Sequence, residues 1–243
     1  PLIIFLNLLF AIWGRFTTKI LKFSLKGMKV VVLSQKQKAI FVANGFKDLE
    51  VIGNSINFPR KAVNIKKKNR VIFAGRLTIG KGVALLIEIL PDFFKKFPGY
   101  EFFFIGEGPL KENLRKLARR YKGVKVTGQI PHGDLLLYYR QAKLAVVPSL
   151  WPEPFGRAAI EALSQTSPAV VSDRGALPEI IKNHRWGVIA KPNPKDFLDS
   201  IEEAIKKNDY FISQIQKDFS QIKTMFSSQV TEKYTKIYQK ISK

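Results

Sequence analysis

From Arg70 onward, short continuous apolar runs alternate with longer segments of helical periodicity, and this alternation constrains the fold more than any other feature of the chain. The runs are rich in Val, Ile and Phe without a polar residue at every second position, which is typical of strands covered on both faces of a parallel sheet. We expect strands over residues 70–75, 101–106, 124–128, 144–148, 169–172 and 187–190, and helices over residues 81–97, 110–121, 134–142, 155–164, 178–181 and 194–206. This alternation predicts an α/β protein with a doubly wound, Rossmann-like parallel sheet.

Outside this region the pattern is less regular. Residues 30–34 form another apolar run, residues 36–44 have helical periodicity, and residues 54–69, with a proline and a Lys triplet, are typical of a linker. Beyond Asn208 the apolar spacing predicts one or two amphipathic helices.

The chain starts with an apolar run rather than with Met. The run extends from Pro1 to Gly14 and is shorter than the roughly 20 residues that span a bilayer. We therefore interpret residues 1–26 either as a partly buried helix whose upstream partner is missing, because the sequence is truncated, or as a helix at a membrane surface.

An excess of cations is the second unusual feature. The chain has 41 Lys and Arg against 19 Asp and Glu, a formal net charge of +22. Such a charge suits nucleic acid, an anionic membrane or phosphorylated ligands, and the alternative is a solvated Lys-rich surface. The cations form no stripe with interleaved aromatic residues, so we expect no nucleic-acid partner. Without cysteine, and with His132 and His184 as its histidines, the chain cannot form a disulfide scaffold or a thiolate metal site.

Three loops that follow predicted strands carry residues suited to an anionic ligand. In doubly wound sheets, ligands bind beyond the carboxyl ends of the strands, near helix N-termini. In the first loop Arg76 leaves a strand and Lys81 opens the next helix, which suits a diphosphate if these are not simply two surface cations. No Ser or Thr follows the Lys, so the loop is not a P-loop. In the second loop Gly106 and Gly108 precede a proline and allow a ligand to approach backbone N–H groups, although this is also a common turn.

The third loop lies in the segment PSLWPEPFGRAAIEALS and gives the sharpest prediction. Glu153 lies in a proline-flanked loop and Glu161 in the following helix, about 12 Å away if the segment were fully helical. Paired carboxylates of glycoside hydrolases stand roughly 5–9.5 Å apart. The longer spacing suits two hydroxyl-bearing groups at opposite ends of one ligand, such as a sugar and a ribose joined by a diphosphate, whereas Glu161 alone would be interpreted as an exposed helix residue.

In this order, the three loops resemble the donor-binding domain of retaining GT-B glycosyltransferases of family 4, the glycosyl transferases group 1. The resemblance extends over about residues 30–205, and its most specific part is the E-x7-E pattern of Glu153 and Glu161. It implies a hexosyltransferase that moves a sugar from a nucleoside diphosphate sugar to a saccharide or lipid-linked acceptor, as in the synthesis of glycans or lipopolysaccharide. The alternative is a nucleotide-sugar-binding module that is inactive without its N-terminal domain.

The resemblance also implies roles for individual residues. Arg76 and Lys81 would hold the donor diphosphate and stabilise the leaving group, and Glu153 would bind hydroxyls of the transferred sugar; these are the implied catalytic residues. The implied donor-binding residues are Gly75, Gly106, Gly108, Ile130 at the base, Phe155, Gly156 and Glu161 at the ribose. No metal or other cofactor is expected, because the two cations take the metal's place. Arg174 stands where the family often has Gly, and either brings a cation to the donor or points to solvent.

The resemblance finally divides the chain. Residues 1–57 would be a remnant of the N-terminal acceptor domain with a linker, residues 58–208 the donor-binding domain and residues 209–243 C-terminal helices. The family's catalytic His belongs to the preceding domain, so we interpret His132 as an ordinary loop residue and His184 as a surface residue. The expected location is the cytoplasm, where a basic surface would favour peripheral contact with an anionic membrane.

Overall fold

The computed structural model of this 243-residue chain describes residues 20, 23, 28–182, 184–226 and 230–241. The helix expected over residues 1–26 lies almost entirely outside these residues. The chain divides into two compact units, Pro1–Ile52 and Gly53–Lys243. The predicted domain boundaries at residues 58 and 209 remain predictions.

Within residues 28–52, the smaller unit contains a pair of parallel strands and the helix between them. Strand β1 (Val30–Val32) pairs with β2 (Leu49–Val51), and α2 (Gln35–Ala43) connects them. Helix α2 begins at Ser34, whose hydroxyl accepts a hydrogen bond from the Gln37 N–H at 3.1 Å. The sequence did not predict β2, because its middle residue is the charged Glu50, which forms an ion pair with Lys29 at 3.0 Å.

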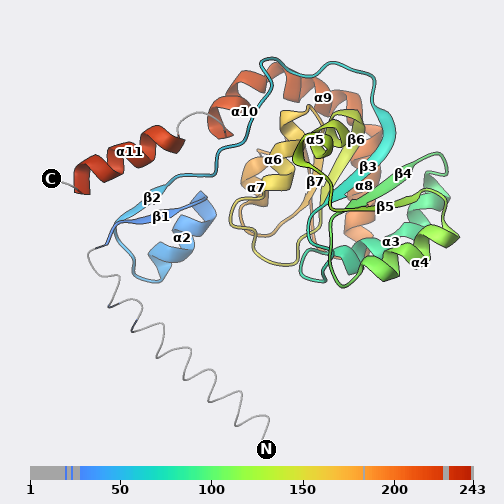
Figure 1. Cartoon of the computed structure of the whole chain (residues 1–243), viewed down its shortest axis with the longest axis horizontal. Coiled ribbons are helices and arrows are strands. Elements are labelled where there is room, and N and C mark those ends of the chain that lie inside the picture. The colour runs from blue at the N-terminus through green and yellow to red at the C-terminus, as the bar shows by residue number, and fades with distance from the viewer. Residues whose placement is uncertain (1–19, 21–22, 24–27, 183, 227–229, 242–243) are drawn as a thin grey trace, which may run out of the picture. The chain divides into compact units, whose positions relative to one another are not determined.

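The larger unit is built on a six-stranded sheet in which every pair of neighbours is parallel (Figure 1). Its strands are β3 (Lys68–Ala74), β4 (Glu101–Ile105), β5 (Val124–Gly128), β6 (Ala142–Val147), β7 (Ala169–Ser172) and β8 (Gly187–Ala190). The order across the sheet is β5-β4-β3-β6-β7-β8, so the chain runs outward from β3 in one direction and then outward from β6 in the other. This is the topology of a doubly wound sheet with a switch point between β3 and β6, and it confirms the predicted fold class.

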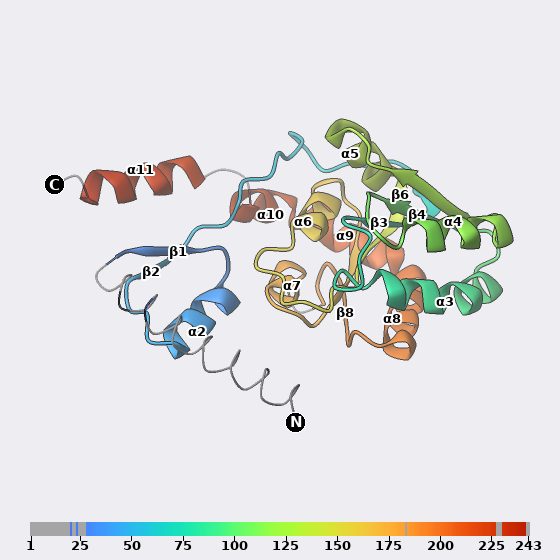
Figure 2. The same cartoon turned by 60° about the horizontal axis from the view of Figure 1, so that its bottom comes forward.

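Helices cover both faces of the sheet, which explains the continuous apolar runs. They are α3 (Val83–Lys96), α4 (Lys111–Arg120), α5 (His132–Gln141), α6 (Arg157–Ser164), α7 (Leu177–Ile180) and α8 (Pro194–Lys206). In β4, Phe102 packs against Phe93 of α3 with ring centroids 5.3 Å apart, whereas the next residue, Phe103, packs against Tyr138 of α5 at 5.2 Å. Because successive residues of a strand point to opposite faces, α3 and α5 lie on opposite sides of the sheet. Helix α8 packs on α3, and α6 packs on α5 (Figure 2).

The C-terminal region contains α9 (Asn208–Lys217), α10 (Phe219–Phe226) and α11 (Val230–Ile241). The prediction of one or two helices is therefore wrong. Helix α9 ends at Asp218, whose carboxylate accepts hydrogen bonds from the Arg185 guanidinium and from the Trp186 indole at 2.8 Å. The hydrogen bond from Arg185 is the main cause that lowers the pKa of Asp218 to about 2. The apolar spacing continues across this break, so periodicity alone could not reveal it. Within the described residues, no helix is both long enough and apolar enough to cross a bilayer.

Lys67, one residue before β3, joins the ends of two helices. Its Nζ donates to the carbonyl oxygen of Arg140 in the last turn of α5 at 2.9 Å, and to that of Gln165, just after α6, at 3.1 Å. Burial, and then the nearby charge of Arg140, lower the pKa of the Lys67 amine to about 7. An ordinary Lys in the unfolded chain has a pKa of about 10.4. Charged Lys67 is therefore disfavoured by folding, and its cost to stability is complete below pH 7.

This shift predicts a pH-dependent stability that a Lys67→Met variant lacks. As the pH rises from about 7 toward about 10, folded Lys67 loses its proton while unfolded Lys67 keeps it, so the cost to the wild type disappears progressively. We expect the melting temperature of the wild type, relative to that of Lys67→Met, to be higher at pH 9 than at pH 6. Thermal unfolding at both pH values measures this difference, and a constant difference contradicts the prediction.

Candidate functional site

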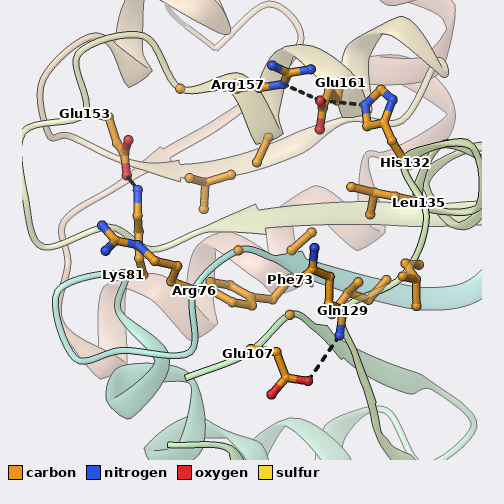
Figure 3. Close-up of a pocket in the computed structure, with 18 residues that line it drawn as sticks. Phe73, Arg76, Lys81, Glu107, Gln129, His132, Leu135, Glu153, Arg157 and Glu161 are labelled. Atoms are coloured by element: carbon orange, nitrogen blue, oxygen red, sulfur yellow. Dashed lines mark hydrogen bonds and ion pairs between the residues drawn. The ribbon is translucent and has the colours of Figure 1, made fainter. Parts of the chain in front are cut away.

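A cavity of about 660 Å³ lies at the carboxyl ends of the central strands, beside the switch point between β3 and β6 (Figure 3). Residues at or just beyond strand ends form part of its wall: Phe73, Ala74 and Gly75 of β3, Ile105 and Gly106 of β4, Gln129 and Ile130 after β5, and Val147 of β6. The remaining wall comes from loops and from the first turns of α5 and α6. This is the place at which sheets of this topology bind their ligands.

Glycines bring the ends of β3 and β4 close together at the wall of the cavity. Gly106 has a φ of 138°, and a Cβ built on it would lie 2.0 Å from the carbonyl oxygen of Gly75. The Gly75 N–H donates to Ile105 O, and the Gly106 N–H donates to Gly128 O, both at 2.9 Å. A side chain at Gly106 would therefore separate the strands and displace the wall.

One end of the cavity contains an ion pair between two predicted site residues. Lys81 Nζ lies 2.5 Å from Glu153 Oε1, and Ser149, buried at the end of β6, donates its hydroxyl to the same oxygen at 2.8 Å. Ser172 Oγ in turn donates to Ser149 O at 2.6 Å, so the Glu153 carboxylate is fixed through β6 and β7. Arg76 is exposed at this end and lies alongside Lys81 (Figure 3).

The backbone of the Glu153 loop is held by the segment that follows β7. The Ala176 N–H donates to Glu153 O at 2.7 Å. Gly175, with a φ of 60°, lies so close that a Cβ on it would be 2.2 Å from Glu153 O. Arg174 does not line the cavity and forms an ion pair with Asp173 at 3.4 Å, so of its two expected placements the structure shows the one away from the cavity.

The opposite end of the cavity is formed by Glu161 and two donors (Figure 3). Arg157 Nε donates to Glu161 Oε1 at 2.7 Å, and His132 Nε2 contacts the same oxygen at 2.9 Å. The Glu161 side chain is only 5% exposed, whereas those of Arg157 and His132 are 59% and 47% exposed. Tyr139, the buried residue of α5, lies near this charge. Burial, and then the charge of Glu161, raise the pKa of Tyr139 well above its usual range.

A third carboxylate, Glu107, lies on the loop after β4. Its Oε1 accepts hydrogen bonds from Lys111 Nζ at 2.6 Å and from the Gln129 N–H at 3.3 Å. The hydrogen bond from Lys111 is the main cause that lowers the pKa of Glu107 below its usual range. Glu107 therefore fixes the backbone just before Ile130, in the loop where the nucleobase is expected.

Most of the predicted site residues meet in this cavity. Its lining includes Gly75, Arg76, Lys81, Gly106, Ile130, Glu153, Gly156 and Glu161. Gly108 and Phe155 do not line it: Gly108 packs against the backbone of Leu77, and the ring of Phe155 is buried with its centroid 6.3 Å from that of Phe226. The roles of all ten residues remain predictions.

Sequence reasoning missed five polar residues of the site: Glu107, Gln129, His132, Ser149 and Arg157. The interpretation of His132 as an ordinary loop residue is wrong, because it is the first residue of α5 and lines the cavity. Arg157 could have been found, since it precedes Glu161 by one helical turn, a spacing that favours ion pairs. Within the described residues, no three His, Asp or Glu side chains gather as a metal site would require.

The segment that carries the cavity matches a known family. The family described as "Glycosyl transferases group 1" matches residues 55–222, a span that contains every residue of the lining.

Several curated proteins are similar to this chain. It is 31% identical over 172 residues to an uncharacterised glycosyltransferase of Methanocaldococcus jannaschii, and 32% identical over 155 residues to glycogen synthase of Mycobacterium tuberculosis. It is 26% identical over 239 residues to the gpi3 subunit of phosphatidylinositol N-acetylglucosaminyltransferase of Schizosaccharomyces pombe. These alignments cover 67%, 61% and 93% of this chain but 43%, 37% and 52% of the relatives, so the chain spans about half of their length or less.

Solved structures share the fold. TarM of S. aureus, in a crystal that contains UDP, is similar with a TM-score of 0.75 and 22% identity, over 86% of this chain and 43% of TarM. Anabaena HepE in complex with UDP-glucose is similar with a TM-score of 0.70 and 20% identity, over 88% of this chain and 63% of HepE. The parallel sheet with flanking helices is thus that of GT-B glycosyltransferases.

Proposed function

The chain belongs to the glycosyl transferases group 1 family, and from this membership we propose that it binds a nucleoside diphosphate sugar and transfers the sugar to a saccharide or lipid-linked acceptor with retention of anomeric configuration. The proposal depends on one observation: the same cavity has two cations, Arg76 and Lys81, at one end and the carboxylate of Glu161 at the other. Glu153 lies beside the cations, at the end where the sugar is expected.

The arrangement of charges suits such a donor along its length. The diphosphate would lie against Arg76 and Lys81, whose positive charges would balance part of its negative charge. The sugar would reach Glu153, the ribose would reach Glu161, and the base would meet the backbone around Ile130 and Gln129. Uracil is the first base to test, because the TarM structure contains UDP and the HepE structure contains UDP-glucose.

The same residues suggest a mechanism. The bond between the anomeric carbon and the β-phosphate oxygen breaks, and the acceptor oxygen bonds to the anomeric carbon on the same face. The acceptor's proton passes to the departing diphosphate, whose negative charge Arg76 and Lys81 stabilise. Neither Glu153 nor Glu161 acts as a nucleophile in this scheme, and we propose that no metal ion takes part.

The acceptor is proposed more broadly than the donor. Glycogen synthase, by its name, acts on a saccharide, and phosphatidylinositol N-acetylglucosaminyltransferase, by its name, acts on a lipid. We propose a cytoplasmic enzyme whose net charge of +22 favours an anionic membrane surface. The second candidate is a donor-binding module that needs a further domain for turnover. It is favoured because the alignment covers only 43% of the Methanocaldococcus jannaschii relative.

A thermal-shift panel of UDP, GDP, ADP and their sugar derivatives tests the donor proposal. A ligand at a hundred times its dissociation constant stabilises the folded state by about 2.7 kcal/mol, which raises the melting temperature of a domain of this size by roughly 5–10 °C. We expect such a shift with one base and an unchanged shift in the presence of EDTA. If no member of the panel shifts the melting temperature, the proposed function is wrong.

A further inference from the structure

The two oxygens of the Glu161 carboxylate have different surroundings, and this difference indicates how the carboxylate could bind a ligand. Both donors, Arg157 Nε and His132 Nε2, contact the same oxygen, Oε1. The other oxygen, Oε2, is turned toward the interior of the cavity (Figure 3). A carboxylate held in this way presents one acceptor atom in a fixed direction to whatever occupies the cavity.

The two donors differ in the part of the fold to which they connect Glu161. Arg157 lies on the same helix, one turn earlier, so its contact fixes the carboxylate only relative to α6. His132 comes from a different helix and contacts Glu161 across the α5–α6 interface. The C-terminal ends of these same helices are joined by Lys67, which donates to Arg140 O and Gln165 O. The separation of α5 and α6 is therefore fixed at two places, one of which is the His132–Glu161 contact.

His132 also connects Glu161 to the loop expected at the base. Gln129 and Ile130, which line the cavity, precede His132 by only a few residues. The Gln129 N–H donates to Glu107, so this loop is held at one end by Glu107 and at the other by the contact of His132 with Glu161. Movement of the loop would consequently move the donor that orients Glu161.

From this geometry we infer that His132 is a positioning residue that orients Glu161 so that Oε2 accepts a hydroxyl of the ligand's ribose, and that His132 thereby sets the preference for ribonucleotides over deoxyribonucleotides. The inference rests on the proposed function. The imidazole acts through its Nε2 proton, which it donates to the carboxylate. His132 lies at the end of the cavity opposite Glu153 and Lys81, so it takes no part in bond breaking (Figure 3).

Binding of matched nucleotides tests this inference. UDP, GDP and ADP, each with its 2′-deoxy and 3′-deoxy counterparts, are titrated into the 243-residue chain and into the variants His132→Ala, His132→Gln, Arg157→Ala and Glu161→Gln by calorimetry. Gln at position 132 keeps an N–H donor at a similar reach. The matched control is His184→Ala, because His184 does not line the cavity.

We expect the wild type to bind one ribonucleotide about tenfold or more tightly than one of its deoxy counterparts, because a hydrogen bond to a charged acceptor contributes about that much. His132→Ala should reduce this ratio by about threefold to tenfold, His132→Gln should restore most of it, and His184→Ala should leave it unchanged. A merely structural role for His132 would weaken all nucleotides equally and keep the ratio.

The outcomes separate the inference from the proposal on which it rests. A wild type that binds ribonucleotides and deoxyribonucleotides equally, or a His132→Ala variant that folds and keeps the wild-type ratio, overturns the inference while the proposed function stands. If His132→Ala does not fold, His132→Gln with a lost ratio also overturns it. Absence of binding by every nucleoside diphosphate overturns the proposed function itself.

Discussion

A chain in which Arg76 and Lys81 are both changed to Ala is expected to bind nucleoside diphosphates about a hundredfold to ten-thousandfold more weakly than the wild type. Both cations line the cavity at the end that holds Glu153. Each contact between a cation and a phosphate contributes roughly 1.5–3 kcal/mol, so the loss of two such contacts gives an effect of this size.

The two single variants should differ. The Arg76 guanidinium forms no hydrogen bond or ion pair with another residue in the described part of the chain, so Arg76→Ala removes a ligand contact and little else. Lys81→Ala also leaves the Glu153 carboxylate, which is 11% exposed, with Ser149 as its remaining donor. That carboxylate would then repel the diphosphate, so we expect Lys81→Ala to weaken binding more than Arg76→Ala does.

Calorimetric titration with UDP, GDP and ADP at two salt concentrations measures these effects. The matched control is the double variant Lys116→Ala with Arg119→Ala, which removes the same charge from exposed positions of α4 outside the cavity. If the control weakens binding as much as the cavity variant does, the overall charge of +22 attracts the ligand and the assigned contacts do not.

The strands of the large unit could be predicted because both of their faces are covered by helices, which requires a continuous run of apolar residues in the sequence. Phe102 and Phe104 face α3 while Phe103 faces α5, so every residue of that run has to be apolar. Strand β2 lacks such a run: it has three residues, and its middle residue, Glu50, forms an ion pair with Lys29. Short strands held by charge carry no periodic signal.

Some residues of the candidate site could likewise be predicted from local sequence, whereas others could not. Arg76 and Lys81 lie on the connection after β3, and Glu153 lies on the loop after β6. Parallel strands bring their carboxyl ends to one edge, so the approach of these residues to one another follows from local sequence and topology. The contact between His132 and Glu161 joins residues 29 positions apart on two helices and depends on how α5 packs on α6. No local pattern encodes that contact, so the sequence alone does not predict that His132 belongs to the site.

Glu153→Gln is expected to separate nucleotide binding from sugar transfer. Glu153 forms an ion pair with Lys81 in which Oε1 lies 2.5 Å from Nζ, and a diphosphate that binds Lys81 would compete with this pair. Gln keeps the size of the side chain and can still accept a hydrogen bond from Ser149, but it releases Lys81 from a charged partner. UDP should therefore bind the variant as tightly as the wild type or several-fold more tightly, by the removal of a competing charge.

Transfer should respond in the opposite direction. In the proposed mechanism the Glu153 carboxylate binds hydroxyls of the sugar and lies near the anomeric carbon, which becomes positive as the bond to phosphate breaks. A fixed charge aimed at a developing charge accounts for about a hundredfold to a thousandfold in rate when it is removed. We therefore expect the release of nucleoside diphosphate, in a preparation that transfers sugar to an acceptor, to slow by at least about a hundredfold.

A matched variant separates this effect from the loss of any acidic group. Glu203→Gln breaks a Lys–Glu pair of 2.8 Å on α8, outside the cavity, and should leave both binding and rate unchanged. Wild-type turnover in Glu153→Gln would mean that this carboxylate forms the ion pair with Lys81 but takes no part in transfer. If the variant binds UDP more tightly and also loses transfer, the Glu153 carboxylate has both roles. It competes with the diphosphate for Lys81, and it acts on the sugar of the bound donor.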